Sequence, residues 1–118
     1  MTDEKKALIA FIAALTHNKR PNRRIGAVYD YGRNRYCHFT DNGSNNRLHI
    51  YDFNRNSFIT GTLPNVYDYA SNSYINVEIR NNMFSGYDYE TAQFFSGTIY
   101  DTIVSLYCNG QYSNYSIV

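Results

Sequence analysis

The sequence predicts a mainly β protein, an antiparallel meander of eight to ten short strands that forms a barrel or a sandwich, with one N-terminal α-helix. Three observations support this fold class. The chain contains 13 Tyr and 7 Phe but no Trp, and these aromatic residues favour the pleated surface of a strand. A Tyr-Asp-aromatic triplet recurs along the chain, and turn-forming residues follow its copies. A single apolar run precedes all of them.

Length and composition indicate one domain over residues 1–118. The chain is long enough for one core, 43% of its residues are hydrophobic, and its net charge is +1. Such a composition is not typical of a disordered chain. We divide the domain into a helix over 1–17, a basic linker over 18–24 and β-hairpin repeats over 25–118.

The helix is expected from Thr2 to about His17. Thr2 is a suitable N-cap, and the acidic residues after it suit the positive end of the helix dipole. Its apolar stripe is wide, so it needs a sheet, a barrel mouth or a partner subunit to cover it. We therefore expect the helix to plug a barrel or to form an oligomer. The run 7–15 is too short to span a bilayer, which needs ~20 residues, and it lacks the positive flank of a signal peptide.

The repeat begins after the linker. Four copies contain Tyr-Asp-aromatic, and a fifth at the C-terminus lacks the Asp. In all five, another aromatic residue follows five positions after the last one. The residues between them favour turns, so each copy is expected to be a hairpin. The aromatic pairs that should flank the five turns are Tyr31/Tyr36, Phe53/Phe58, Tyr69/Tyr74, Tyr89/Phe94 and Tyr107/Tyr112. The turn positions expected to accept left-handed backbone are Asn34, Asn56, Asn72, Ala92 and Gly110.

The expected strands cover 25–31, 35–41, 46–53, 57–62, 65–70, 73–80, 83–89, 93–99, 102–108 and 111–117. Their register stays open. Asn109-Gly110 predicts a two-residue turn with Tyr107 opposite Tyr112, whereas the Asn in the other copies suggests a three-residue loop that brings Asp30 nearer to Tyr36. Glycines after Thr60, Ser85 and Ser96 indicate a bend, a bulge or a close backbone approach. The expected core is Leu8, Phe11, Ile12, Leu15, Val28, Ile50, Val66, Ile75, Val77, Ile79, Ile103, Val104 and Leu106.

Four repeated aspartates have two interpretations. They are Asp30, Asp52, Asp68 and Asp88. They initiate turns by accepting a backbone N–H two residues on, or they form a ring of carboxylates at one barrel end that binds a cation or sugar hydroxyls. Repetition favours the first interpretation, because every hairpin needs its turn.

The basic residues gather in the first half of the chain. Residues 1–60 carry a net charge of +5 and residues 61–118 a net charge of −4. Basic residues with interleaved tyrosines suit phosphates or single-stranded nucleic acid, and the competing interpretations are a solvated linker or a contact with the acidic half of a second copy. The candidate ligand-binding residues are Lys19, Arg20, Arg23, Arg24, Arg33 and Arg35.

The sequence offers little for catalysis or metal binding. Cys37 and His38 are adjacent, so a strand would point them to opposite faces, and no zinc-type spacing exists. We expect no catalytic residue, no metal and no cofactor. Cys37 and Cys108 are interpreted as free thiols of a cytoplasmic protein, with one disulfide as the alternative.

The Tyr-Asp repeat, spaced by 16 to 22 residues, resembles the tyrosine–aspartate repeats of large bacterial toxin shells. The likeness covers the Tyr-Asp pair and the following turn, and the Gly-Arg that usually follows occurs only after the first copy, as Gly32-Arg33. The resemblance therefore implies shared hairpin chemistry and transfers no function.

The function expected from the sequence is a non-enzymatic binding or self-assembly module of a small bacterial-type protein. Two alternatives stay open. The first is an anionic-ligand or nucleic-acid binder that uses the basic linker. The second is a lectin-like module that binds carbohydrate through Tyr, Asn and Asp loops. The expected partners are a second copy of the chain or an anionic ligand, and no membrane.

Overall fold

The computed structural model describes residues 1–17, 26–44 and 47–118. Within them the chain forms one helix followed by ten strands, as the hydrophobic pattern predicts. The elements are α1 (Asp3–His17), β1 (Ala27–Asp30), β2 (Arg35–Asp41), β3 (Arg47–Asp52), β4 (Ser57–Thr62), β5 (Asn65–Asp68), β6 (Ser73–Arg80), β7 (Met83–Asp88), β8 (Gln93–Tyr100), β9 (Ile103–Cys108) and β10 (Gln111–Ile117).

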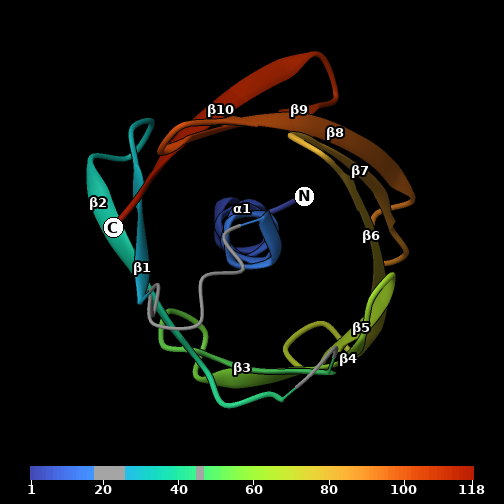
Figure 1. Cartoon of the computed structure of the whole chain (residues 1–118). Helices are drawn as coiled ribbons and strands as arrows, with labels where there is room; N and C mark the ends of the chain where they lie inside the picture. The colour runs from blue at the N-terminus through green and yellow to red at the C-terminus, as the bar shows by residue number, and fades with distance from the viewer. Residues whose placement is uncertain (18–25, 45–46) are drawn as a thin grey trace.

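The ten strands form a closed antiparallel barrel, so the structure selects the barrel over the sandwich. Each strand pairs with its neighbour along the chain, and β1 closes the ring by pairing with β10, where Tyr29 lies opposite Ser116. Figure 1 shows the ring viewed along its axis. Closure removes the exposed strand edges of an open meander, which would otherwise pair with other chains.

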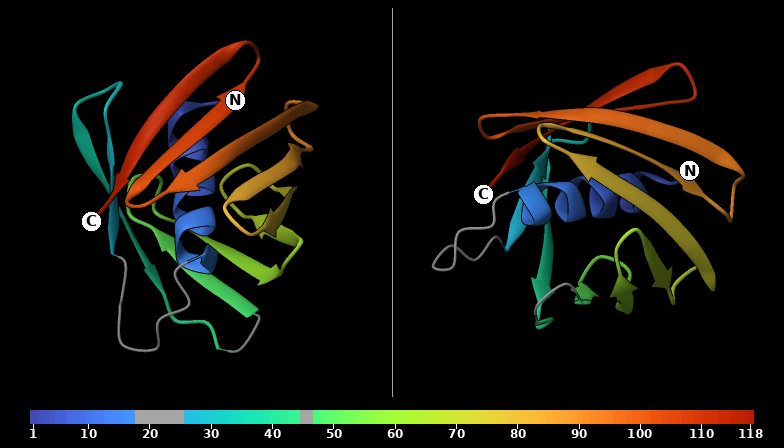
Figure 2. Two further views of the ribbon diagram at one scale, coloured as in Figure 1. Left: turned by 45° about the horizontal axis from the view of Figure 1, so that its top comes forward. Right: turned by 45° about the vertical axis from the view of Figure 1, so that its right-hand side comes forward.

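The helix α1 lies inside the barrel and runs along it (Figures 1 and 2). Eight strands already leave an interior that side chains fill, so ten strands enclose additional space. The helix occupies that space: every residue from Ala7 to Ala14 is fully buried, and Phe11 stacks on Phe39 with ring centroids 4.7 Å apart. The wide apolar stripe of α1 is therefore explained by burial on all sides, and of the predicted alternatives the barrel plug is the one observed.

The helix begins where the sequence predicts, with Thr2 as its N-cap residue. The backbone N–H of Lys5 donates to the hydroxyl of Thr2 at 3.2 Å, which is the expected N-cap bond. Alanines at positions 7, 10, 13 and 14 keep the helix slim on several sides, so the surrounding strands can pack against it with branched side chains.

Alternate residues of each strand face the helix and form the core. Most of the predicted core is fully buried, as expected for inward positions with a period of two. The fully buried members are Leu8, Phe11, Ile12, Val28, Ile50, Val66, Ile75, Val77, Val104 and Leu106, and the half-buried members are Leu15, Ile79 and Ile103.

The register of the first four hairpins differs from the three-residue loop that Asn34 suggested. Asp30 pairs with Arg35 and Tyr29 pairs with Tyr36, so the turn contains four residues. The predicted left-handed positions are confirmed, because Asn34, Asn56 and Asn72 each have φ of 51° and Ala92 has φ of 56°. The predicted loop length of three residues was wrong, because one left-handed residue is compatible with either a three- or a four-residue turn.

The fifth hairpin has the two-residue turn that Asn109-Gly110 predicts. Both residues have positive φ, at 52° and 78°, and Tyr107 lies opposite Tyr112. Its alignment with the other copies shifts, however. Tyr107 takes the strand position of Tyr29, and Cys108 takes the inward position that an aspartate occupies in the other hairpins.

Two inward-facing glycines permit close packing inside the barrel wall. Gly86 lies opposite Phe95, and Gly97 lies opposite Phe84 on the paired strands β7 and β8. A Cβ at either glycine would collide with the ring of the opposite phenylalanine. Of the alternatives that the sequence left open for these positions, close approach is the one observed.

Three further points of the sequence analysis concern the cysteines, a membrane-spanning helix and the basic linker. Cys37 and Cys108 are both free and buried. No helix in the described part of the chain is both long and apolar enough to cross a membrane. The basic linker over 18–24 lies outside the described residues.

Candidate functional site

Four buried aspartates form a ring inside one end of the barrel. Asp30, Asp52, Asp68 and Asp88 are the last residues of β1, β3, β5 and β7, and each is at most 4% exposed. Asp30 and Asp52 each accept a backbone N–H two residues on, at 3.0 and 2.9 Å. Asp88 accepts the backbone N–H of Glu90 in the same way, at 3.4 Å. The turn-initiation interpretation is therefore confirmed for these three, and all four carboxylates also gather at one end.

Two arginines from the turns neutralise part of this ring. Arg33 lies 2.6 Å from Asp30 and 3.2 Å from Glu4 of the helix. Arg55 lies 2.7 Å from Asp52 and donates to both oxygens of Asp68 at 2.9 Å. Burial alone would lower the pKa of Arg55, but its hydrogen bonds to Asp68 and Asp52 outweigh that effect and raise the pKa.

The helix supplies the third cation. Lys5 is 1% exposed, and its ammonium lies 2.9 Å from Asp88 and 2.8 Å from Glu90. Burial would raise the pKa of Asp88, but hydrogen bonds from Thr91 and Lys5 and the charge of Lys5 lower it below its usual value. These contacts tie the first turn of α1 to the barrel rim.

The ring therefore carries its own cations. Within the described ranges, no group of three or more His, Cys, Asp or Glu side chains is placed to hold a metal ion. Lys5 was not among the residues that sequence reasoning assigned to a site. A lysine next to an apolar helical run is a weak signal, and the carboxylates that accept its hydrogen bonds, Asp88 and Glu90, lie more than eighty residues away along the chain.

The six predicted ligand-binding residues divide into three groups. Lys19, Arg20, Arg23 and Arg24 lie outside the described residues. Arg33 is engaged by Asp30 and Glu4, and it also donates to the buried sulfur of Cys37 at 3.4 Å. Arg35 is exposed and begins β2 opposite Asp30. The described part of the set thus contains one arginine held by the barrel and one open to solvent.

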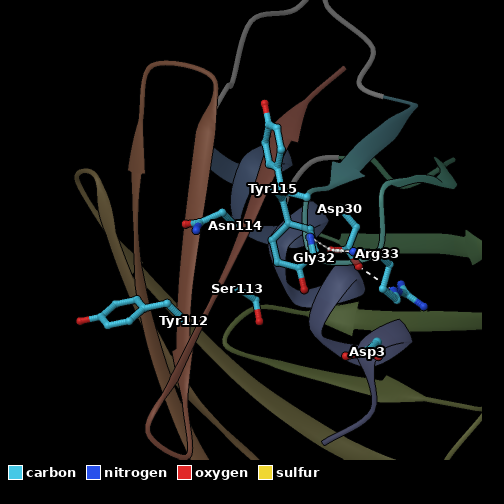
Figure 3. Close-up of a pocket in the computed structure, with 9 residues that line it drawn as sticks. Asp3, Asp30, Gly32, Arg33, Tyr112, Ser113, Asn114 and Tyr115 are labelled. Atoms are coloured by element: carbon cyan, nitrogen blue, oxygen red, sulfur yellow. Dashed lines mark hydrogen bonds and ion pairs between the residues drawn. The ribbon is translucent and has the colours of Figure 1, made fainter.

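A polar cavity of about 380 Å³ lies where the first and fifth hairpins meet. Figure 3 shows Asp30, Arg33 and Asp3 on one side of it, while Tyr112 and Asn114 point away from them. The fifth hairpin, on one side of this cavity, has a shorter turn than the first hairpin and lacks the aspartate. Tyr115 is buried in its wall, and burial together with the charge of Asp30 raises the pKa of its hydroxyl. Since Arg33 is already paired, the cavity offers little unpaired positive charge to a ligand.

The outside of the same barrel end carries an aromatic belt. Every strand contributes one outward aromatic residue beside the turns, and four of the five turns add another. Ten of these residues are 40–78% exposed. The outer aromatic belt consists of Tyr29, Tyr36, Tyr51, Phe58, Tyr67, Tyr74, Tyr87, Phe94, Tyr107 and Tyr112 on strands and Tyr31, Phe53, Tyr69 and Tyr89 in turns.

Within each of the first four hairpins, the belt residues form a triad. In the first, Tyr29 contacts Tyr31 and Tyr36 edge to face, with ring centroids 5.1 and 4.9 Å apart. The other three hairpins repeat this arrangement with centroid distances of 4.7 to 5.0 Å. Such pairs contribute ~0.5–1.5 kcal/mol beyond the burial of their area. The central ring is half-buried, and the two outer rings remain accessible.

Neighbouring triads are displaced along the barrel. We count the displacement between the strand aromatics of two neighbouring hairpins. Between β4 and β5 it is two residues, because Tyr67 lies opposite Thr60 and not opposite Phe58. Between β2 and β3 it is four residues, because Tyr51 lies opposite Thr40 and not opposite Tyr36. The smaller displacement brings a turn aromatic beside a strand aromatic of the preceding hairpin. A cavity of about 390 Å³ opens there, lined by Asn56, Ser57, Phe58, Thr60 and Tyr69.

No protein-family model, curated protein or solved structure matches this chain. Two features of the described residues bear on its function. One is the network of ion pairs inside one end of the barrel, and the other is the exposed aromatic belt outside the same end.

Proposed function

We propose that this chain is a non-enzymatic binding module that meets its partner through the outer aromatic belt. The observation that carries the proposal is the belt itself, in which every strand places an aromatic ring on the outside at one barrel end. Monomeric proteins rarely expose large continuous apolar patches without an interaction partner. Aromatic residues are also the residue types that most often dominate binding energy.

The interior of the same barrel end supports a binding role and not a catalytic one. The carboxylates that a catalytic hypothesis would use are Asp30, Asp52, Asp68 and Asp88, and each of them is bound to an internal cation. Their ion pairs hold the helix and the turns in place. The barrel thus acts as a rigid support, and rigid aromatic side chains lose little conformational freedom on binding.

The distribution of the belt favours a small or chain-like partner over a second copy. An isologous dimer covers one side of each protomer, whereas the belt includes residues from all ten strands and so surrounds the barrel. Self-assembly remains the competing function of this surface. The two free, buried thiols support a reducing, cytoplasmic setting for it.

A second candidate function uses the basic residues. The first half of the chain carries +5 and the second half −4, and Arg33 is engaged within the barrel. An anionic ligand or nucleic acid would therefore be bound by Lys19, Arg20, Arg23 and Arg24, with exposed Arg35 nearby in sequence. This hypothesis predicts a steep dependence of binding on salt concentration.

The experiment compares the wild type with a belt variant and a matched control. The belt variant carries Tyr31→Ser, Tyr74→Ser and Phe94→Ser, and the control carries Tyr100→Ser, because Tyr100 is 79% exposed but ends β8 away from the belt. All proteins are tested on a printed glycan array, on immobilised single-stranded oligonucleotide and by sedimentation velocity over a range of concentrations.

The proposal expects the wild type to bind a probe or to self-associate, the belt variant to lose that interaction, and the control to keep it. Equal far-ultraviolet circular dichroism and equal unfolding midpoints would show that the belt variant is folded. A belt variant that binds as the wild type does would overturn the proposal. So would a wild type that retains no probe and stays monomeric throughout.

A further inference from the structure

One seam of the belt contains a cavity with two aromatic walls. The backbone N–H of Tyr69 donates to the carbonyl oxygen of Phe58 at 3.1 Å, so the two residues lie directly across neighbouring strands. Their side chains are 52% and 45% exposed. The space beside them, about 390 Å³, is also lined by Asn56, Ser57 and Thr60. Four of its five lining residues therefore carry hydrogen-bonding side chains, since Tyr69 also has a hydroxyl.

The chemistry of this lining selects the class of ligand. None of the five lining residues is charged, which disfavours phosphate or sulfate. Aromatic ring faces suit the apolar C–H face of a ring-shaped ligand, while hydroxyl and amide groups suit its polar edge. We propose that this cavity, called here the Phe58–Tyr69 groove, is a subsite for an uncharged sugar residue. This inference rests on the proposed binding function of the belt.

The next seam repeats the same set of positions. Asn72, Ser73, Tyr74, Asn76 and Tyr89 correspond in turn to Asn56, Ser57, Phe58, Thr60 and Tyr69. The defining backbone bond also recurs, since the N–H of Tyr89 donates to the carbonyl oxygen of Tyr74 at 3.2 Å. The side-chain amide of Asn76 donates to Asn65 at 3.2 Å and still has acceptor capacity on its oxygen.

The remaining seams lack this arrangement, and the reason is visible in the register. Between β2 and β3 the larger displacement places Phe53 across from His38 instead of Tyr36. The fifth hairpin has no turn aromatic to stand beside Phe94. The barrel therefore repeats this arrangement of positions at two successive seams between hairpins, and each is a candidate subsite. Two weak subsites on one rigid body favour a linear polysaccharide, because its second contact forms at a high effective concentration.

The direct test is affinity electrophoresis of the full chain in gels that contain a soluble neutral polysaccharide. A β-glucan, a xylan and an α-glucan serve as three probes, and calorimetry with a matching short oligosaccharide measures single-subsite binding. The inference expects one of these polymers to retard the protein and to bind more tightly than its oligosaccharide. The groove variant carries Phe58→Ser and Tyr69→Ser. The matched control carries Met83→Ser and Tyr100→Ser, which remove two exposed side chains at the opposite end of the barrel, outside the belt.

The groove variant is expected to lose about 10²-fold in affinity for the polymer, because one of two linked subsites is gone. The control is expected to bind as the wild type does. A subtler variant, Thr60→Val, keeps both walls and removes one hydroxyl, and we expect it to lose about tenfold.

The outcomes separate this inference from the proposed function. If no neutral polysaccharide retards the wild type while the belt binds oligonucleotide or a second copy, the sugar subsite is wrong and the belt remains a binding surface. If the groove variant and its control weaken polymer binding equally, the groove is not the site. If neither the polysaccharides nor the other probes bind, both proposals fail.

Discussion

The ammonium of Lys5 on the central helix lies 2.9 Å from a carboxylate oxygen of Asp88, which is 83 residues later in the chain. Both side chains are almost completely buried. A contact between groups so distant in sequence orders the first turn of the helix against the barrel wall. Since the belt residue Tyr87 precedes Asp88 on the same strand, the contact also fixes the inner face of a strand whose outer face carries the belt.

We predict that Lys5→Met lowers the free energy of unfolding by about 3–5 kcal/mol, because it leaves the buried Asp88 without its cation. Chemical denaturation followed by circular dichroism measures this change. Lys6→Met is the matched control, since Lys6 is half-buried on the same helix turn, and it is expected to change the free energy by less than about 1 kcal/mol. Adding Asp88→Asn to Lys5→Met should recover part of the loss. A Lys5→Met variant as stable as the wild type would contradict the assigned role.

The pKa of Asp88 predicts how stability depends on pH. Its folded-state pKa is lowered, since the hydrogen bonds from Thr91 and Lys5 exceed the opposing effect of burial. A carboxyl of this kind contributes stability above its unfolded pKa of about 3.9 and loses that contribution as the pH falls through the folded value. We therefore expect the free energy of unfolding to decline below about pH 5. Asp88→Asn should show a shallower decline, and an identical pH profile would refute the assignment.

Much of the fold could be predicted from local sequence patterns, and the two predictions that were wrong have identifiable physical causes. The period-two alternation and the left-handed Asn34, Asn56 and Asn72 locate the hairpins, because side-chain direction and backbone sterics act within a few residues. The register of the first hairpin did not follow, since turn length depends on strand pairing. The fifth copy was misaligned because its Tyr107 matched the spacing of the turn aromatics while Cys108 had replaced the aspartate.

The candidate site was predictable in part. Repetition alone identified the four aspartates and the aromatic residues that form the belt. Repetition did not identify Lys5 or Arg55 as their partners, because those contacts join the helix or one turn to a different hairpin. The two-residue displacement that forms the Phe58–Tyr69 groove was likewise hidden, since it depends on how neighbouring hairpins align around the closed barrel.

We predict that the barrel does not remain intact without its central helix. Deleting residues 1–17 removes a core that includes fully buried Leu8, Phe11 and Ile12, each worth ~1.5–3 kcal/mol in burial alone. Size-exclusion chromatography should show aggregation of the truncated chain. Adding a synthetic peptide of residues 1–17 during refolding should restore a fraction of the native species. A truncated chain that is monomeric and as stable as the full chain would contradict this role of the helix.

Gly97 provides a sharper test of packing inside the wall. A Cβ there would collide with the ring of Phe84 and with the carbonyl oxygen of Ser105. Gly97→Ala is therefore expected to lower the free energy of unfolding by ~1–3 kcal/mol, as overpacking typically does. Gly26→Ala is the control, because nothing lies within 4 Å of a Cβ at that position. Combining Gly97→Ala with Phe84→Leu should recover part of the loss, and the absence of any recovery would show that the ring is not the obstacle.

The basic segment allows a final prediction that separates three roles. Lys19, Arg20, Arg23 and Arg24 lie within six residues of sequence, so they can meet one ligand within a Debye length of ~8 Å at physiological salt. If they bind an anion, changing Arg20, Arg23 and Arg24 to Ala reduces retention on heparin or oligonucleotide and leaves the assembly state unchanged. Each lost phosphate contact should lower the logarithmic salt slope by about 0.7–0.9.

The competing role of the same residues is a contact with the acidic half of a second copy, since residues 61–118 carry −4. In that case the triple variant changes the oligomeric state in sedimentation velocity, and heparin retention is unaffected. Arg47→Ala is a matched control, because Arg47 is an exposed arginine of the same basic half outside the cluster. If retention and assembly are both unchanged in the triple variant, the segment is a solvated linker. Anion binding and subunit pairing through these residues would then both be wrong.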